Sequence, residues 1–132
     1  KFSKTLTKRV EAGATKNYDY VVSYESPIDG GVNLWHCGEI PFVFHNVDLV
    51  AGSYGGSQDA YDLQDVMASA WVNFATTGDP NGDGLAYWPE ADENMGYIQL
   101  GNGISTHDEE LTDLEKLMMD YTTNYFNFPV AD

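Results

Sequence analysis

GVNLWHCGEIPFVF, residues 31–44, places one histidine, His36, in a loop that also contains glycine and tryptophan. An apolar strand pattern lies upstream of this loop, and a short aromatic helix pattern, residues 39–44, follows it. Imidazole has an unperturbed pKa of about 6.5, so a histidine held in such a loop can accept and return a proton near neutral pH. The stretch therefore makes His36 a candidate for proton transfer in an α/β domain, while these residues alone also fit a core histidine hydrogen-bonded to backbone.

The residues on either side of the loop alternate between strand and helix patterns. Residues 18–24 are β-branched and aromatic with apolar side chains on both faces, which predicts a buried central strand. Residues 63–74 carry apolar side chains at helical spacing before a stop signal, Gly78, which predicts an amphipathic helix. The other expected elements are a helix over 1–12, loops over 45–58 and 78–94, a strand over 95–100, and a helix over 111–125 with Thr106 and Glu109 as its capping box.

This order of elements gives only two strands for about four helices. A strand that is apolar on both faces needs helices above and below it and a neighbour at each edge. We therefore expect the neighbours of strand 18–24 to lie on sequence outside these 132 residues. The first residue, Lys1, is neither an initiator Met nor the start of a signal peptide, so the chain is expected to begin inside a longer one.

The composition is that of a folded, acidic domain. Hydrophobic residues make up 42% of the chain and aromatic residues 14%, which is enough apolar surface to offset the entropy of ordering the chain. Residues 17–132 contain 20 Asp and Glu against one basic residue, Lys116. That charge would repel nucleic acid and an anionic membrane face, so neither is an expected partner. A single cysteine, Cys37, rules out an internal disulfide and leaves the cellular compartment open.

Four motifs, the first of them in the histidine loop itself, follow one another along the chain. HCGE at 36–39 is followed by FVF at 42–44, WVNFATTGDPN occupies 71–81, and WP occupies 88–89. Together they resemble the type-B carboxylesterases, the α/β-hydrolase family that includes the cholinesterases. The family patterns are H-G-x-E, then F-V-F, then W-x-x-F-A-x-T-G-x-P-N, then W-P. The resemblance covers about residues 18–126, in the order and spacing of the family.

The resemblance implies an α/β fold class in which residues 1–132 are the C-terminal part of a single α/β-hydrolase domain, with about two strands and four helices. His36 would be the catalytic histidine that takes the proton from a serine hydroxyl during attack on a small-molecule ester and gives it to the departing alcohol. Glu39 matches a family glutamate that looks like a brace for the loop, holding backbone donors. Trp35 would either line the substrate pocket or pack under the loop. No cofactor is implied.

The other catalytic residues are not among these 132. No G-x-S-x-G nucleophile elbow occurs, because Ser53 lies in AGSYG and Ser57 in GGSQD. The serine and the Glu or Asp of the triad are therefore expected on the remainder of the hydrolase domain, and the chain is expected to be inactive alone. Without that partner, strand 18–24 and the side chains of Trp71 and Phe74 are expected to lie open and to favour self-association.

One position departs from the family pattern. Cys37 stands where a glycine is common, and its Cβ favours ordinary backbone angles, so the loop is expected to turn differently. A Cys37 nucleophile is disfavoured because consecutive residues rarely face each other, and a zinc site with His36 and His45 lacks the usual ligand spacing. His45 and His107, at a helix end and just before a helix, are expected to lie in exposed turns.

Two other functions remain open. Some members of the family are adhesion modules that keep the fold and lose the catalytic triad, so a non-catalytic binding module is one alternative. The other is a calcium-binding module, because Asp79, Asn81, Asp83, Gly84 and Glu90 satisfy the EF-hand loop pattern. No helix pattern leaves that loop after Glu90, however, and the chain has no second loop of this kind.

Overall fold

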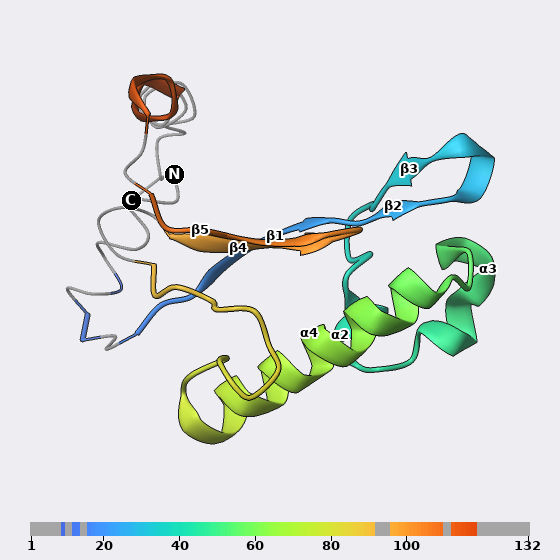
Figure 1. The fold of residues 1–132 in the computed structure, drawn as a ribbon, viewed down its shortest axis with the longest axis horizontal. Coiled ribbons are helices and arrows are strands. Elements are labelled where there is room, and N and C mark those ends of the chain that lie inside the picture. Colours follow the sequence, from blue (N-terminus) through green and yellow to red (C-terminus); the bar gives the residue numbers. More distant parts are fainter. Residues whose placement is uncertain (1–8, 10–11, 14–15, 92–95, 110–111, 119–132) are drawn as a thin grey trace, which may run out of the picture.

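The computed structural model describes residues 9, 12–13, 16–91, 96–109 and 112–118. These residues form an α/β arrangement of one three-stranded sheet, a small two-stranded hairpin, one long helix and several short helical turns (Figure 1). Most of the helix predicted over 1–12 and most of the helix predicted over 111–125 lie outside the described residues.

The sheet combines one parallel and one antiparallel pairing. Its strands are β1 (Asp19–Ser23), β4 (Tyr97–Gly101) and β5 (Ile104–His107), in the order β1-β4-β5. β1 runs parallel to β4, and β5 returns antiparallel along the other side of β4. The strand predicted over 95–100 is therefore confirmed as β4, whereas β5 was not predicted.

β5 shows that the predicted capping box of the last helix is wrong. Thr106 lies in β5 opposite Ile98, so it does not form a capping box with Glu109. The described helical turn instead follows Thr112, whose backbone N–H and hydroxyl donate to the Glu115 carboxylate at 2.8 and 2.7 Å. The Glu115 N–H donates to the Thr112 hydroxyl at 3.3 Å, which completes a capping box at this later position. The Thr112 bonds lower the pKa of the Glu115 carboxyl.

α4 (Gln58–Thr77) is the longest element and confirms the predicted amphipathic helix. Its N-cap is Ser57, whose side chain accepts a hydrogen bond from the Ala60 N–H. Its C-cap is Gly78, which has a left-handed φ of 78°. The local signals at both ends of this helix, a capping serine and a terminal glycine, therefore set its bounds.

The residues between the histidine loop and α4 are more structured than predicted. The short helix expected over 39–44 is α2 (Ile40–Val43), but the expected loop over 45–58 contains two helical turns, η2 (Val47–Val50) and α3 (Ala51–Tyr54). Helices this short have no stability of their own, so packing holds them. The buried side chains of these three turns are Phe42, Val47 and Tyr54.

A two-stranded hairpin follows β1 and packs against α3. β2 (Glu25–Ser26) and β3 (Val32–Asn33) pair antiparallel around the turn η1 (Ile28–Gly30). α3 ends at Gly55, which has a left-handed φ of 77°, and a Cβ on Gly55 would lie 2.1 Å from Cγ of Pro27. This contact leaves no space for a side chain between α3 and the start of η1.

One hydrophobic core joins the sheet to α4. α4 lies along one face of the sheet and contacts both α2 and β4 (Figure 1). The larger buried side chains of this core are Tyr24, Phe42, Val47, Tyr54, Leu63, Met67, Trp88, Ile98 and Leu100. None of the helices in the described part of the chain combines the length and apolar character that crossing a membrane requires.

β1 lies at the edge of the described sheet. β4 pairs with it on one side, and no strand among the described residues pairs with it on the other. Tyr20 and Val21 are 40% and 49% exposed. The predicted strand is confirmed as β1, and it lies open, as expected for a central strand whose other neighbours are not among the described residues. The outer side of β1 is an open parallel edge.

We expect the 132-residue chain to self-associate in solution, because an open strand edge can pair with another strand. Val21→Lys, which places a charge on that edge, is expected to shift the chain toward monomer in size-exclusion chromatography. Val72→Lys is the matched control, since Val72 is 65% exposed but lies on α4 rather than on β1. A wild-type monomer that binds no hydrophobic dye would contradict this expectation.

Candidate active site

His36 lies in a tight turn formed by residues 35–38. The Gly38 N–H donates to the Trp35 carbonyl at 2.9 Å, which closes the turn. His36 occupies the second position of the turn and Cys37 the third, and of these two only Cys37 has a positive φ, 63°. A positive φ at the third position alone is the pattern of a type II turn. The turn leaves His36 exposed to solvent.

The turn follows the carboxyl end of β1. The hairpin β2–β3 comes between them in the sequence, and α2 begins directly after the turn with Pro41 in its first helical positions (Figure 1). In α/β proteins ligands bind beyond the carboxyl ends of the strands. In sequence, the turn thus belongs to the connection that leaves the carboxyl end of β1.

The backbone of Cys37 contradicts the loop geometry expected from the sequence. A Cβ at this position was expected to force ordinary angles and a different turn, but Cys37 adopts the left-handed region as a glycine would. For a residue with a Cβ this conformation costs roughly 1–2 kcal/mol. Such strain persists only where the surrounding structure fixes the backbone.

A buried tyrosine, Tyr54, contacts both ends of the turn. Its ring centroid lies 5.5 Å from that of Trp35, and its hydroxyl donates to the Gly38 carbonyl at 2.7 Å. Burial, and secondarily the charge of Glu39, raises the pKa of the Tyr54 hydroxyl, so that it stays protonated and able to donate. Tyr54 was not predicted as a site residue because it lies in a segment expected to be a loop and belongs to no motif.

Two further aromatic side chains fix Tyr54 in place. The Phe42 ring meets the Tyr54 ring edge-on at 5.2 Å, and the Tyr24 ring lies 5.2 Å from that of Phe42. The Tyr24 hydroxyl donates to the Tyr54 backbone carbonyl at 2.7 Å. All three side chains are buried. Tyr24, Phe42 and Tyr54, which we call the aromatic support, thus form a rigid base under the turn.

Trp35 and Glu39 flank the turn in different environments. Trp35 packs on Tyr54 and is still 49% exposed, so its roles in lining a pocket and in packing under the loop both stay predictions. Glu39 is the N-cap residue of α2, but its side chain makes no capping hydrogen bond. Burial first and the Glu39 charge second raise the pKa of Tyr20, as they do for Tyr54. The expected role of Glu39 as a loop brace stays a prediction.

No hydrogen bond joins the His36 ring to another described residue. A His–carboxylate pair occurs elsewhere among the described residues: Nε2 of His45 lies 2.7 Å from Asp65, on the exposed surface. His107 lies in β5 rather than in a turn, and its ring stacks on that of Tyr97 at 4.5 Å. Among the described residues, no group of three His, Cys, Asp or Glu side chains is placed to hold a metal ion. Within the described residues, His36 is therefore paired with neither a carboxylate nor a hydroxyl.

Hydrogen bonds within the loop itself hold the segment that fits the EF-hand pattern. Asn81 exchanges bonds of 2.8 and 2.9 Å with the Trp88 backbone. The Asp79 carboxylate accepts the Asn81 backbone and side-chain N–H groups at 3.0 and 2.8 Å, and these bonds lower the pKa of Asp79. Asp83 and Glu90 do not join Asp79 in a metal-binding group. The geometry therefore gives the calcium-binding alternative no support.

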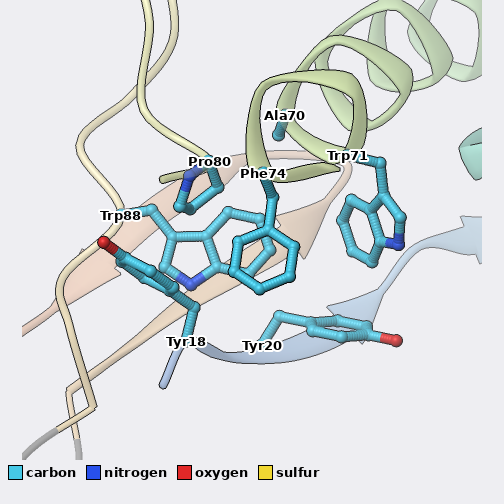
Figure 2. Close-up of a pocket in the computed structure, with 7 residues that line it drawn as sticks. All are labelled: Tyr18, Tyr20, Ala70, Trp71, Phe74, Pro80 and Trp88. Carbon is cyan, nitrogen blue, oxygen red and sulfur yellow. The ribbon is translucent and has the colours of Figure 1, made fainter. Parts of the chain in front are cut away.

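An aromatic groove lies between α4 and β1 and uses none of the turn residues (Figure 2). Its volume is about 210 Å³. The Trp71 ring lies 5.0 Å from Tyr20 and 5.5 Å from Trp88, and the Trp88 indole N–H donates to the Asp19 carbonyl at 2.8 Å. That bond anchors the loop before β4 to the start of β1. The groove is lined by Tyr18, Tyr20, Ala70, Trp71, Phe74, Pro80 and Trp88.

A protein-family model described as the carboxylesterase family matches residues 2–121. Carboxylesterase 1E of Mus musculus is 47% identical over 84 residues, which is 64% of this chain and 15% of that protein. Carboxylesterase 1C of Mus musculus is 44% identical over 66 residues, which is 50% of this chain and 11% of that protein. The chain therefore spans only a small part of the length of the curated relatives that it matches.

Solved esterase structures have the same fold in this region. An esterase from anaerobic Clostridium hathewayi, which can hydrolyse aliphatic aromatic polyesters, has a TM-score of 0.69 and 28% identity over 80% of this chain and 21% of its own. Carboxylesterase EST55 of Geobacillus stearothermophilus has a TM-score of 0.66 and 29% identity over 87% of this chain and 24% of its own. The predicted fold class, an α/β-hydrolase arrangement, is confirmed.

We expect Cys37→Gly to raise the free energy of unfolding by up to about 1.5 kcal/mol. Glycine removes roughly 1–2 kcal/mol of left-handed strain and adds back roughly 0.5–1 kcal/mol of conformational entropy in the unfolded chain. Cys37→Val is the contrasting variant, because a β-branched side chain tolerates a positive φ poorly and should lower stability. Thermal unfolding followed by circular dichroism measures both, and an equal loss in the two variants would refute the left-handed assignment.

We expect titration calorimetry with Ca²⁺ to show no sub-millimolar site in this chain. The oxygens of Asp79 and Asn81 already accept hydrogen bonds, so a cation would have to displace them. Asp65→Ala, which removes an exposed carboxylate outside the loop, is the control for Asp79→Ala. Sub-millimolar binding that Asp79→Ala abolishes and Asp65→Ala preserves would restore the calcium-binding alternative.

Proposed function

This chain belongs to the carboxylesterase family, and from that premise we propose that it contributes the general-base histidine, His36, to a carboxylic-ester hydrolase. The hydrolase would use a Ser-His-Glu or Ser-His-Asp triad on small-molecule esters. The 132 residues would form the histidine-bearing part of one α/β-hydrolase domain. The nucleophile and the acid would come from the remainder of that domain.

The observation that carries this proposal is the way in which His36 is presented. Its side chain is exposed on a turn, while the two ends of that turn contact one buried residue, Tyr54. A general base must reach a hydroxyl on another element while its own backbone stays fixed. A histidine with only a packing role in the core would be buried. An exposed histidine without a function would not need a turn whose two ends are held by a buried tyrosine.

The chemistry requires one imidazole in two protonation states. A ring nitrogen of neutral His36 takes the proton from the serine hydroxyl as that oxygen bonds to the ester carbonyl carbon. The resulting imidazolium gives the proton to the departing alcohol, which leaves an acyl-enzyme. In the second half, the same nitrogen takes a proton from water as the water attacks the acyl carbon, and it returns that proton to the serine oxygen. The carboxylate of the triad would hold the other ring N–H and stabilise the imidazolium.

The open surfaces of the chain support the proposal that the rest of the hydrolase domain packs against it. The chain covers 11–24% of the relatives and solved structures described above. β1 has an open parallel edge, and next to it Tyr20 and Phe74 of the aromatic groove are 40% and 47% exposed. We assign the edge and the groove to contact with the remainder, which would add a parallel strand beside β1 and cover the apolar side chains.

A non-catalytic binding module of the same fold is the second candidate. It would keep the aromatic support and the sheet contacts but would have no serine for His36 to activate. The two candidates differ at one position on the remainder. A serine in a G-x-S-x-G elbow means a hydrolase, and its replacement means a binding module.

We expect the purified 132-residue chain to show no turnover of a p-nitrophenyl ester, because a base without its nucleophile has nothing to activate. In the complete enzyme, His36→Ala is expected to lower kcat on the order of 10⁴-fold or more. His45→Ala is the matched control, since His45 pairs with Asp65 on the surface and should leave kcat unchanged. Turnover by the chain alone that His36→Ala abolishes would refute the need for a remainder.

A further inference from the structure

We propose that Tyr54 is the positioning residue for His36, and that its hydroxyl and ring hold the turn of residues 35–38 in the strained conformation that presents the imidazole. The inference deepens the proposed function and rests on the assignment of His36 as the general base. It concerns the geometry of the chain itself and can be tested without any ester.

The contacts of Tyr54 fall on the two ends of the turn and leave its middle free. The ring packs on Trp35, the first residue, at 5.5 Å, and the hydroxyl donates to the carbonyl of Gly38, the last, at 2.7 Å. His36 and Cys37 lie between these two points. One rigid side chain therefore fixes the distance and orientation between the ends of the turn, and with them the direction in which the imidazole leaves the backbone.

The strain at Cys37 makes this support necessary. The turn is closed internally only by the hydrogen bond from the Gly38 N–H to the Trp35 carbonyl. A cysteine at φ 63° favours a return to negative φ, which would rotate the neighbouring peptide groups and carry the His36 side chain with them. Tyr54 opposes that return because the Gly38 carbonyl would have to leave its hydroxyl.

The Gly38 carbonyl has no easy substitute for this donor. Gly38 is buried, and a Cβ there would lie 3.0 Å from the Trp35 carbonyl oxygen and 3.1 Å from Leu34, so the site is closely packed. A buried carbonyl without a hydrogen bond is costly. Loss of the Tyr54 hydroxyl therefore favours a rearrangement of the turn over an unpaired carbonyl in the original geometry.

Tyr54 is itself held more firmly than the turn that it supports. Its backbone carbonyl accepts the Tyr24 hydroxyl at 2.7 Å, and its ring meets Phe42 edge-on. The next residue, Gly55, packs against Pro27 with no space for a Cβ. Backbone, ring and following residue are thus fixed by three separate contacts. The position of the hydroxyl is set by the core and does not follow movements of the turn.

The test uses Tyr54→Phe, which keeps the ring and removes the hydroxyl, in the 132-residue chain studied by NMR. The Gly38 amide is expected to exchange with solvent about tenfold faster. The Cys37 carbon shifts are expected to leave the range of left-handed backbone, and the His36 ring signals to broaden or double. Unchanged Cys37 shifts and unchanged Gly38 exchange would overturn the proposal.

Trp88→Phe is the control for a loss of general stability. It also removes a buried donor to a backbone carbonyl, the indole N–H that donates to Asp19 at 2.8 Å, but Trp88 belongs neither to the aromatic support nor to the turn. Both variants should lose thermal stability, while only Tyr54→Phe moves the Cys37 and His36 signals. Equal movement of those signals in Trp88→Phe would also overturn the proposal.

A rescue variant separates positioning from a merely structural role. Glycine adopts the left-handed region without strain, so adding Cys37→Gly to Tyr54→Phe should restore a single set of His36 ring signals. A general packing defect would not be repaired by a substitution at position 37. Persistent doubling of the His36 signals in the double variant would therefore refute the positioning role of Tyr54. If Tyr54→Phe alone does not fold, the double variant is compared with Cys37→Gly alone. The proposal then requires the same turn signals in both, and a difference would overturn it.

The outcomes for Tyr54 and for the proposed function are distinct. The NMR signals report the turn whether or not an ester is hydrolysed. A rearranged turn in Tyr54→Phe, together with full activity of His36→Ala in the complete enzyme, would reject the general base while keeping the geometric result. A turn that does not respond, together with an inactive His36→Ala enzyme, would reject Tyr54 as the positioning residue and keep the general base.

Discussion

The hydrogen bond from the Tyr24 hydroxyl to the Tyr54 carbonyl is the constraint on which the rest of the described structure depends. Tyr24 directly follows β1, and Tyr54 ends α3, so this bond joins the sheet to the helical turns that surround the histidine. The Phe42 ring of α2 packs against both tyrosines. α2 and α3 have four residues each and would not form alone, so the aromatic support decides where they lie. The turn that carries His36 takes its position from them.

The sequence predicted those parts of the fold whose signals are periodic or local. α4 has apolar residues at helical spacing between a capping serine and a terminal glycine, and the anchor at Trp88 belongs to a motif. The histidine loop was also located from a motif. What escaped prediction depends on contacts between distant residues. β5 needs β4 beside it, and the hydroxyl of Tyr54 acquires its role only when α3 folds against Gly38, 16 positions away.

Cys37 and Thr106 show two ways in which a sound local rule can fail. The rule that a Cβ avoids positive φ is correct in energy, but tertiary contacts at both ends of the turn outweigh roughly 1–2 kcal/mol of strain. The capping-box pattern at Thr106 and Glu109 is equally well formed in sequence. Thr106 is paired with β4, so it cannot cap a helix. The capping box forms instead six positions later, between Thr112 and Glu115.

Gly55 shows how packing behind the histidine turn restricts a residue that belongs to no motif. Its left-handed φ and the 2.1 Å separation that an added methyl carbon would have from Pro27 leave no room for a larger residue, whereas Gly52, earlier in α3, has open space around it. A side chain can therefore be accommodated at position 52 but not at position 55. The hairpin turn at Pro27 thus sets the place of Tyr54 from the side opposite to the histidine, through the glycine that follows the tyrosine.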